Sequence, residues 1–290
     1  MAETLGWIGI GSMGHRMTRH LVAAGHTLVV ADAVSAERAP AGAKIAKSNA
    51  EVAALADTII LSLPDGTASE AVAKEIAAAS PRKVRTVIDT STIGIKAAET
   101  VAGILSKAVI AFVDAPVSGG TAGADKATLA IMLACPEPTF ERLKPLMSLM
   151  GKPFYVGSKP GHGQAVKLLN NFLSATALAA TSEAIAFGTR QGIDMQKILD
   201  IVNVSTGRNT ATDDKFPRRI INEKYDAGFT AKLQLKDIKL YLESARASGI
   251  SNEVASSVVD VWTGLDKAIP GADITIMYPY TRDGRAKPKG

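Results

Sequence analysis

Short apolar runs alternate with amphipathic stretches through the first half of the chain. Apolar runs that predict β-strands cover residues 4–10, 27–32, 58–64, 84–90, 109–116 and 128–134, with a short strand at 43–46. Stretches with helical periodicity lie between several of them, at 13–25, 49–55 and 68–79. Strands that alternate with helices are typical of parallel βαβ units. The continuous apolar run at 58–64 indicates a strand that is buried on both faces of its sheet.

Helical periodicity replaces this alternation after about Tyr155. A long helix is expected from Gln164 to Gln191, and Asp194 is placed to cap the helix that follows. Two further helices are expected at 216–222 and 233–248. The segment SKPGHG, residues 158–163, has the composition of a linker. The sequence therefore predicts an α/β domain over residues 1–162 with a mostly parallel sheet, then an all-α domain over residues 163–290.

Composition and charge exclude several classes of protein. The 290 residues are 47% hydrophobic and 21% charged, with a net charge of +5, which is ordinary for a globular protein. The last nine residues, RDGRAKPKG, contain four basic residues and one acidic residue, so we expect a disordered basic tail. No basic run interleaved with aromatic residues occurs elsewhere, which argues against nucleic-acid binding. The single cysteine, Cys135, allows no internal disulfide, and we expect it to be a small buried hydrophobe.

The chain has no sequence pattern of a membrane or exported protein. The longest apolar stretch, residues 172–187, is interrupted by polar residues and is shorter than the roughly 20 residues that a span needs. No signal-peptide pattern precedes the first strand. We therefore expect no membrane partner and a cytoplasmic location. The four histidines lack the spacing of metal ligands, so no metal site is predicted.

The loop GIGSMG follows a predicted strand and opens a predicted helix. Its glycines match the G-x-G-x-x-G pattern: Gly9 for the tight turn, Gly11 for close approach of a pyrophosphate, and Gly14 for packing of helix on strand. Backbone N–H groups at the start of the helix would bind the phosphates. The loop, including Ser12 and Met13, therefore predicts a dinucleotide-binding site, although an ordinary βα turn is the alternative.

Asp32 ends the second predicted strand, about 20 residues beyond the glycines. An acid at this place can accept hydrogen bonds from both hydroxyls of the adenosine ribose, and it would repel a 2′-phosphate. No arginine follows immediately to hold such a phosphate, because Arg38 is farther along the chain. NAD is therefore favoured over NADP, and a simple turn-forming role is the alternative for Asp32.

Further candidates follow later strands, where open α/β sheets bind their ligands. Leu63, Pro64 and Thr92 lie at such strand ends, and Thr92 could contact the cofactor, cap the next helix, or do both. In the segment DAPVSGG, Ser118, Gly119 and Gly120 offer a hydroxyl and accessible backbone N–H groups. These groups suit a small carboxylate, and a glycine-rich loop without a ligand is the alternative.

Lys167 and Asn171 lie four residues apart near the start of the long helix, in GHGQAVKLLNN. This spacing puts both side chains on one helix face. A lysine in an apolar run is costly unless it has a partner or a task. Burial can bring the pKa of a lysine from ~10.4 to about 7–8, where the amine exchanges protons at neutral pH. Lys167 is thus the candidate general acid/base and Asn171 a candidate substrate ligand; a lysine that snorkels to water beside a surface amide is the alternative.

Lys236 and Asp237 begin a later helix. Lys236 could close over a cofactor or an anionic substrate, and a solvated charge pair is the plain alternative.

As a set, these motifs resemble the β-hydroxyacid dehydrogenases, the group that contains 3-hydroxyisobutyrate dehydrogenase and tartronate semialdehyde reductase. The resemblance covers about residues 5–280 and extends more distantly to 6-phosphogluconate dehydrogenase. It rests on GIGSMGHRM at 9–17, DTST at 89–92, DAPVSGG at 114–120, GHGQAVKLLNN at 161–171 and KD at 236–237. The chain departs from the family pattern at Ala68, Ala127 and the pair Ala134–Cys135.

The resemblance implies a Rossmann domain joined by a long helix to an all-helical domain that takes part in oligomerisation, often in dimers or tetramers. It implies that Lys167 is catalytic, that Ser118, Gly119 and Gly120 contact the substrate carboxylate with the support of Asn171, and that Lys236 lies over the cofactor. It also implies that Leu63, Pro64 and Thr92 line the cofactor groove.

The sequence therefore predicts an oxidoreductase that moves a hydride between a nicotinamide cofactor and a short-chain 3-hydroxy acid or its semialdehyde. NAD is the expected cofactor, with NADP as the alternative, and the expected partners are a small anionic substrate and further copies of the chain. Reduction of another carbonyl or of an imine on the same scaffold is one alternative function. A non-catalytic dinucleotide-binding module is the other.

Overall fold

The computed structural model describes residues 4–35 and 37–284, and the chain divides into two compact units, Met1–Lys167 and Leu168–Gly290. The predicted basic tail therefore lies outside the described residues from 285 onward. Its first residue, Arg282, is the last residue of a short helix, and its Nε donates to Asp283 Oδ1 at 2.8 Å.

A nine-stranded sheet forms the centre of the first unit. Its order is β3-β2-β1-β4-β5-β6-β8-β7, with β9 paired to β8. The strands from β3 to β6 are parallel, β8 runs antiparallel to β6 and β7, and β9 is parallel to β8. The strand bounds are β1 (Thr4–Ile8), β2 (Thr27–Ala31), β3 (Lys44–Ile45), β4 (Thr58–Leu61), β5 (Thr86–Asp89), β6 (Ala111–Asp114), β7 (Val117–Ser118), β8 (Leu129–Ala134) and β9 (Gly151–Gly157). The predicted mostly parallel α/β domain is confirmed.

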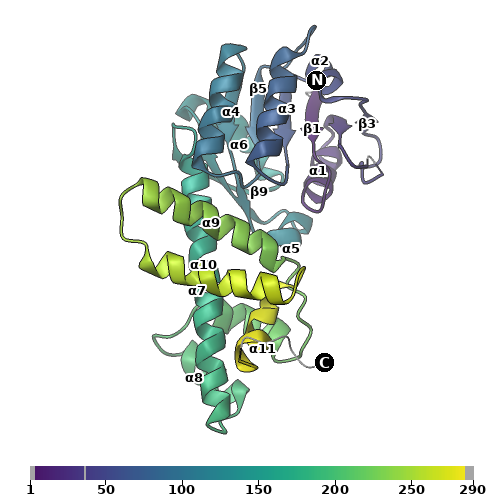
Figure 1. Ribbon diagram of the computed structural model, residues 1–290. Coiled ribbons are helices and arrows are strands. Elements are labelled where there is room, and N and C mark those ends of the chain that lie inside the picture. Colours follow the sequence, from purple (N-terminus) through teal and green to yellow (C-terminus); the bar gives the residue numbers. More distant parts are fainter. Residues whose placement is uncertain (1–3, 36, 285–290) are drawn as a thin grey trace. The chain divides into compact units, whose positions relative to one another are not determined.

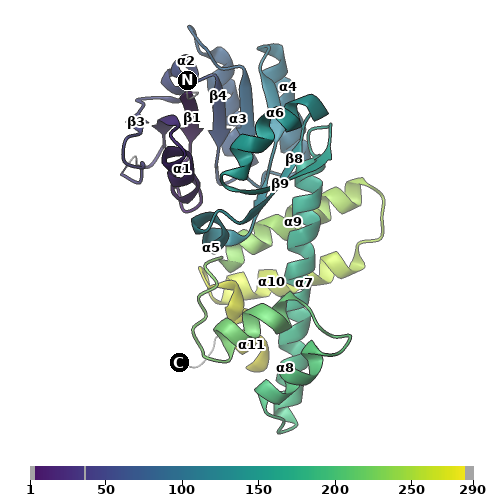
Figure 2. The same ribbon diagram turned by 180° about the vertical axis from the view of Figure 1, so that it is seen from behind.

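Helices cover both faces of this sheet. The helices of the first unit are α1 (Gly14–Ala23), α2 (Asn49–Leu55), α3 (Gly66–Ala78), α4 (Ile95–Lys107), α5 (Gly120–Asp125) and α6 (Glu137–Ser148). Figure 1 shows α3 and α4 on one face, and Figure 2, from behind, shows α6 on the other. Strand residues alternate between the two cores, as the two-residue period of a strand requires. Ile60 packs with α1 and α6, whereas its neighbours Ile59 and Leu61 pack with α2, α3 and α4.

The second unit is helical throughout its regular structure. It contains most of α7 (His162–Arg190), followed by α8 (Met195–Asn203), the π-helix η1 (Ala211–Ile220), α9 (Ala231–Ala247), α10 (Glu253–Ala268), the 3₁₀ helix η2 (Ile274–Ile276) and α11 (Met277–Arg282). Trp262 and Phe216 are fully buried in its core. As predicted, Asp194 caps α8, because its Oδ1 accepts from Lys197 N at 3.1 Å. No helix within residues 4–35 and 37–284 combines the length and hydropathy that a membrane crossing requires.

One element prediction needs correction, and several elements were not predicted. The helix expected at 216–222 lies earlier in the chain, over Ala211–Ile220, and is a π-helix that contains Pro217. The side chain of Asn209 starts it by accepting from Ala211 N at 2.8 Å and Thr212 N at 3.3 Å. The strand β9 and the helices α4, α6 and α10 were not predicted.

Cys135 is buried as expected, and burial raises the pKa of its thiol to about 11.

Candidate active site

The sheet of the first unit brings most of the candidate residues to one edge. Strands β2, β1, β4, β5 and β6 are parallel neighbours, so the loops that follow them leave the sheet on the same side. Asp32 follows β2, Leu63 and Pro64 follow β4, and Thr92 follows β5. The strand order reverses between β1 and β4, which is the place where such sheets bind their ligands.

The glycine loop after β1 has the geometry that its sequence pattern requires. Gly9 has a φ of +93°, and a Cβ there would lie 2.3 Å from the carbonyl oxygen of Ser62. A Cβ on Gly14 would lie 2.0 Å from the carbonyl oxygen of Gly9, so only glycine lets α1 start this close to β1. At Gly11, by contrast, a Cβ would meet no protein atom within 4 Å. The fold itself therefore does not require glycine at position 11, which fits a loop that a ligand approaches closely.

The start of α1 is free of side-chain caps. Met13 is the N-cap residue and makes no side-chain capping bond, and the first turn contains no acidic residue. The dipole and the N–H groups of such a helix end favour an anion. The loop from Gly9 to Gly14, including Ser12, therefore fits the pyrophosphate of a dinucleotide.

Asp32 is tied to the glycine loop by a direct hydrogen bond. Its Oδ2 accepts from Ile10 N at 2.8 Å, and its Oδ1 accepts from Val34 N at 2.8 Å and Ser35 N at 3.1 Å. Burial opposes ionisation of this carboxyl, but the three backbone donors and the positive charge of Arg38 together outweigh burial and lower its pKa. Asp32 is therefore a fixed negative charge beside the loop, as recognition of a ribose diol requires.

The ends of β4 and β5 are joined by Ser91. Its Oγ accepts from Leu63 N at 2.7 Å, and its own N–H donates to Asp89 Oδ1 at 2.9 Å. These bonds fix the backbone of Leu63 and the segment that leads to Thr92. Two candidate cofactor residues are thus held at adjacent strand ends.

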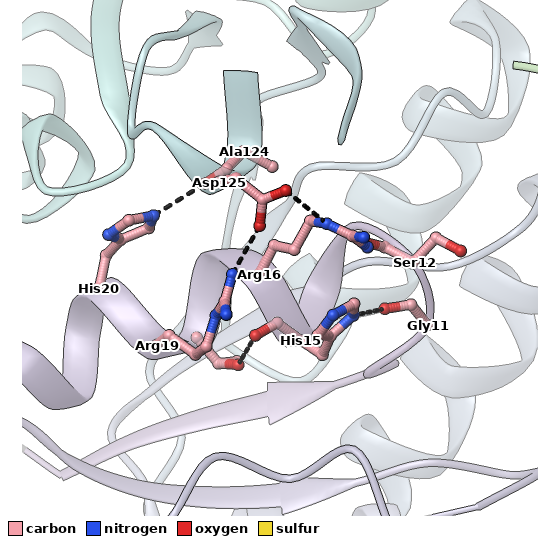
Figure 3. Close-up of polar contacts among 9 residues, drawn as sticks. Gly11, Ser12, His15, Arg16, Arg19, His20, Ala124 and Asp125 are labelled. Carbon is pink, nitrogen blue, oxygen red and sulfur yellow. Dashed lines mark hydrogen bonds and ion pairs between the residues drawn. The ribbon is translucent and has the colours of Figure 1, made fainter. Parts of the chain in front are cut away.

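The segment after β6 carries Ser118 in β7 and leads into α5. Gly119 and Gly120 have φ values of +133° and +63° and are exposed, and a Cβ on Gly120 would meet no atom within 4 Å. Figure 3 shows how α5 is attached to α1: Asp125 accepts from Arg16 Nε at 3.0 Å and from Arg19 at 2.5 Å.

The attachment between α1 and α5 reaches the cofactor loop. Arg16 also donates to the carbonyl oxygen of Ser12 at 2.5 Å, and the ring of His20 lies 2.8 Å from the carbonyl oxygen of Ala124. We call the contacts of Arg16, Arg19 and His20 with Ala124 and Asp125 the α1–α5 clasp. It connects α1, which begins at the end of the glycine loop, with α5, which begins at Gly120.

Lys167 lies in the second turn of α7 and is 8% exposed. This burial argues against the alternative that the lysine snorkels into water. The helix begins directly beside β6, because Asp114 Oδ2 accepts from Gly161 N at 2.9 Å and Gln164 N at 3.1 Å. Lys167 is therefore anchored to the same strand end that leads to Ser118.

Asn171 and Lys236 meet in the second unit through a buried carboxylate. Asp237 is 3% exposed; its Oδ2 accepts from Asn171 Nδ2 at 2.6 Å, and its Oδ1 lies 3.2 Å from Lys236 Nζ. Gln234 Nε2 donates to the carbonyl oxygen of Asn171 at 3.1 Å. A surface amide at Asn171 is therefore wrong, because this residue is 8% exposed, and in the Lys236–Asp237 pair the carboxylate is buried while the Lys236 side chain is 28% exposed. One Nδ2 hydrogen of Asn171 is used by Asp237, and its Oδ1 accepts from Asn170 Nδ2 at 3.2 Å, so a ligand would meet the other Nδ2 hydrogen or the second lone pair of Oδ1.

Two family models account for nearly the whole chain. A model of the NAD binding domain of 6-phosphogluconate dehydrogenase matches residues 4–158, and a model described as NAD-binding of NADP-dependent 3-hydroxyisobutyrate dehydrogenase matches residues 161–281. The chain belongs to the β-hydroxyacid dehydrogenase family. The predicted nicotinamide dinucleotide and hydroxy-acid chemistry are confirmed at the level of the family, and the choice between NAD and NADP is left open by the matches.

Individual relatives agree with this assignment. The chain is 34% identical to 2-(hydroxymethyl)glutarate dehydrogenase of Eubacterium barkeri over 283 residues, which is 89% of this chain and 94% of the relative. It is 33% identical to mitochondrial 3-hydroxyisobutyrate dehydrogenase of Drosophila melanogaster, over 96% of this chain and 89% of the relative. The structure of 3-hydroxyisobutyrate dehydrogenase from Mycobacterium tuberculosis with L-serine superposes with a TM-score of 0.90 at 29% identity, covering 97% of this chain and all of the other.

The sequence did not predict three residues that hold the candidate site of this β-hydroxyacid dehydrogenase. Asp114 and Gln164 fix the start of α7, and Asp237 fixes Asn171 and Lys236. All three stand inside motifs that carried the resemblance, DAPVSGG, GHGQ and KD. A polar side chain inside an otherwise apolar or glycine-rich motif was the signal that could have found them, because buried polar groups need partners.

Proposed function

We propose that the protein transfers a hydride between NAD and a short-chain 3-hydroxy acid or the matching semialdehyde, with Lys167 as general acid/base. The observation that carries this proposal is a buried lysine on a helix anchored to the strand edge that bears the glycine loop. The nicotinamide, when bound, supplies or accepts the hydride. The other groups to which we assign a role belong to this chain.

In the oxidation, the substrate carbon loses a hydride and the hydroxyl loses a proton, so that a carbonyl forms. We assign the proton to Lys167 Nζ, which takes it from the hydroxyl and returns it to the carbonyl oxygen in the reduction. Ser118, Gly119 and Gly120 would bind the substrate carboxylate through the hydroxyl and backbone N–H groups. Asn171 would orient the substrate, and Lys236 would offer a positive charge to the cofactor or substrate.

A preference for NAD over NADP belongs to the same proposal. The fixed charge of Asp32 would repel a 2′-phosphate, and the exposed residues that follow it directly, Ala33 and Val34, carry no positive charge; Arg38, whose charge acts on Asp32, is farther along the chain. The glycine loop would hold the pyrophosphate through Gly9, Gly11, Ser12, Met13 and Gly14. Leu63, Pro64 and Thr92 would line the cofactor site. The ratio of kcat/KM for the two cofactors tests the preference: a higher value with NADP would contradict it.

A homodimer or homotetramer is the proposed assembly, and a cytoplasmic location remains a prediction. Leu169, Leu173 and Phe187 of α7 are 43%, 60% and 68% exposed. Their spacing, by 4 and then 14 residues, puts them on one helix face, and an exposed apolar face of this kind favours a protein partner. The mass of the protein in solution, measured by light scattering, tests this assembly, and a strict monomer at micromolar concentration would contradict it.

Lys167→Ala tests the proposed chemistry. We expect kcat to fall by about 10³-fold or more, since general acid–base catalysis contributes 10²–10⁴-fold, while NAD affinity stays within about threefold. Nicotinamide absorbance over a panel of hydroxy acids, semialdehydes and imines gives kcat, and calorimetry gives the affinity. Lys159→Ala, which removes the same charge at an exposed position outside α7, is the control.

The outcome separates the three candidate functions. A loss of turnover with hydroxy acids in Lys167→Ala alone supports the proposal. Turnover with imines alone would favour the imine reductase, and NAD binding without turnover on any substrate would favour a binding module. Equal losses of turnover and NAD affinity would mean that Lys167 serves the cofactor or the structure.

A further inference from the structure

Gln164 is fully buried and all four hydrogen-bonding positions of its side-chain amide are used. Oε1 accepts from Ile93 N at 2.9 Å and Gly94 N at 3.0 Å, and Nε2 donates to the carbonyl oxygen of Ser91 at 3.1 Å and to Asp114 Oδ1 at 2.8 Å. An amide offers two donor hydrogens and two acceptor lone pairs. A single side chain therefore ties α7 to the segments after β5 and β6.

The orientation of this amide is fixed by the backbone. Turning it over would bring Nε2 against the N–H groups of Ile93 and Gly94, and Oε1 against the carbonyl oxygen of Ser91. Nε2 therefore points at Asp114, whose Oδ1 must be an acceptor. A carboxylate meets this demand at both of its oxygens, because Oδ2 accepts from the backbone N–H groups of Gly161 and Gln164.

Two glycines let the helix come close enough for these bonds. A Cβ on Gly163 would lie 2.7 Å from the carbonyl oxygen of Met132 and 3.0 Å from Asp114 Cγ. Gly161 has a φ of +93°, and a Cβ there would lie 2.8 Å from Ile95 Cγ2. The motif GHGQ thus combines close approach with a complete set of buried hydrogen bonds. We call Asp114, Gly161, Gly163 and Gln164 the α7 dock.

Lys167 follows Gln164 by three residues, less than one turn of α7. Residues at this spacing are neighbours on the helix surface, and they are separated by about 4.5 Å along the axis. A displacement of Gln164 therefore moves Lys167 by a similar amount. Proton transfer is sensitive to such shifts, since a misplacement of about 1 Å can cost 10²-fold in rate.

We propose that Gln164, held by Asp114, is a positioning residue that sets the place of Lys167 at the carboxyl edge of the sheet. This inference rests on the proposed function, because it gives Lys167 the proton-transfer role. Gln164 itself touches neither substrate nor cofactor in this role. It acts through the four bonds that fix the turn of α7 preceding the lysine.

Two substitutions at position 164 separate positioning from stability. Gln164→Met keeps the length of the side chain and removes all four hydrogen bonds, so we expect kcat to fall by about 10²-fold while the KM for NAD changes less than about threefold. The control is Val101→Ala, which removes buried atoms of the other core of the unit, on α4, and leaves the dock intact. We expect its kcat within about threefold of wild type. If Gln164→Met matches Val101→Ala in kcat, the proposal is overturned.

Gln164→Glu adds a readout that a purely structural role would not move. The carboxyl oxygen that replaces Nε2 would face Asp114 Oδ1 and the carbonyl oxygen of Ser91. It could donate a hydrogen bond there only when it is protonated. The negative charge of Asp89 also acts on Asp114, and the ionisable groups in the first two turns of α7 are His162 and Lys167. Two carboxyls this close share a proton more readily at lower pH. We expect the kcat of Gln164→Glu, divided by that of wild type at the same pH, to rise from pH ~8 to pH ~6. The ratio for Gln164→Met stays flat, and parallel ratios for both variants would overturn the proposal.

Hydrogen exchange of the full-length protein tests the dock without any substrate. We expect the backbone N–H groups of residues 161–167 to exchange about tenfold faster or more in Gln164→Met than in Val101→Ala. Unchanged exchange would overturn the dock even if wild type proves inactive with every hydroxy acid, an outcome that would overturn the proposed function alone. Faster exchange with an unchanged kcat would overturn the positioning role.

Discussion

The segment from Asp114 to Asp125 carries the proposed carboxylate-binding groups, and its two ends are held in opposite ways. At the start, Asp114 is fully buried, and its carboxylate accepts from Gly161 N, Gln164 N and Gln164 Nε2. At the end, Asp125 is 44% exposed and paired with the guanidinium groups of Arg16 and Arg19. One end is fixed by neutral donors in the interior, and the other by charges at the surface.

This difference determines which end governs the position of the segment. A buried acceptor leaves costly unsatisfied donors when it is removed. An exposed ion pair is screened by water and salt and is held by flexible side chains. We therefore expect the α7 dock to fix the position of the segment and the α1–α5 clasp to have a smaller effect on it. We expect this even though the clasp contains three charged groups and the dock only one.

Removal of the buried carboxylate should have the largest effect on stability. Asp114→Ala leaves Gly161 N, Gln164 N and Gln164 Nε2 without their acceptor, and each unsatisfied buried donor costs about 1–3 kcal/mol. We expect the free energy of unfolding of the first unit to fall by about 3 kcal/mol, because loss of the carboxylate also relieves its desolvation. Trp7 belongs to the first unit and Trp262 to the second, so urea unfolding in a Trp262→Phe background reports the first unit by fluorescence.

The matched control is Asp125→Ala in the same background. If it destabilises the first unit as much as Asp114→Ala does, the distinction between the two ends is wrong.

The two carboxyls should also respond to pH with opposite signs. Burial, followed by the nearby charge of Asp89, raises the pKa of Asp114 to about 6, against the lowering by its hydrogen bonds with Gln164 and Gly161. The folded state then binds a proton more tightly than the unfolded state does. The contribution of Asp114 to stability is therefore greatest below pH ~4 and decreases as the pH rises through about 6. From the ordinary value of 3.8 to about 6 is about two units, equivalent to roughly 3 kcal/mol.

Asp125 has the reverse dependence. Its hydrogen bond with Arg16 is the main cause that lowers its pKa, so its contribution is present at neutral pH and is lost as the pH falls below its usual range. Urea unfolding of Asp114→Asn and Asp125→Asn between pH ~3 and ~8, each compared with wild type, measures both slopes. Slopes of the same sign would refute the contrast between a desolvated and a charge-paired carboxyl.

The sequence predicted the parts of the fold whose signal is local. Apolar strands at 27–32 and 58–64, the helix at 49–55 and the cap at Asp194 needed only periodicity and turn chemistry. The strand β9 was missed because Lys152 and Pro153 interrupt its apolar pattern and leave only three apolar residues in a row, Phe154 to Val156. The π-helix η1 was misplaced because its start depends on Asn209, and its Pro217 does not follow the usual rules for a helix interior.

The candidate site divides in the same way. Gly9, Gly14 and Asp32 could be assigned from one loop and one spacing, since their roles are set by neighbours in the chain. Asp114 and Gln164 could not, because they are 50 residues apart and meet only when α7 packs beside β6. The sequence shows that both are polar, whereas the three-dimensional structure shows that each satisfies the other.

The smallest effect we expect is on the clasp, and it should depend on salt. Asp125→Asn keeps the shape of the side chain and removes its charge, so the melting temperature of the first unit should fall slightly at low salt. The difference from wild type should vanish near 1 M salt, where the Debye length is about 3 Å compared with about 10 Å at 0.1 M. Asp226→Asn, which removes the exposed Asp226–Arg219 pair of the second unit at 2.8 Å, is the matched control and should leave the Trp7 transition unchanged. A loss in Asp125→Asn that persists at 1 M salt would show that the clasp acts by packing and hydrogen bonding, and that both ends of the segment are held by the same physical means.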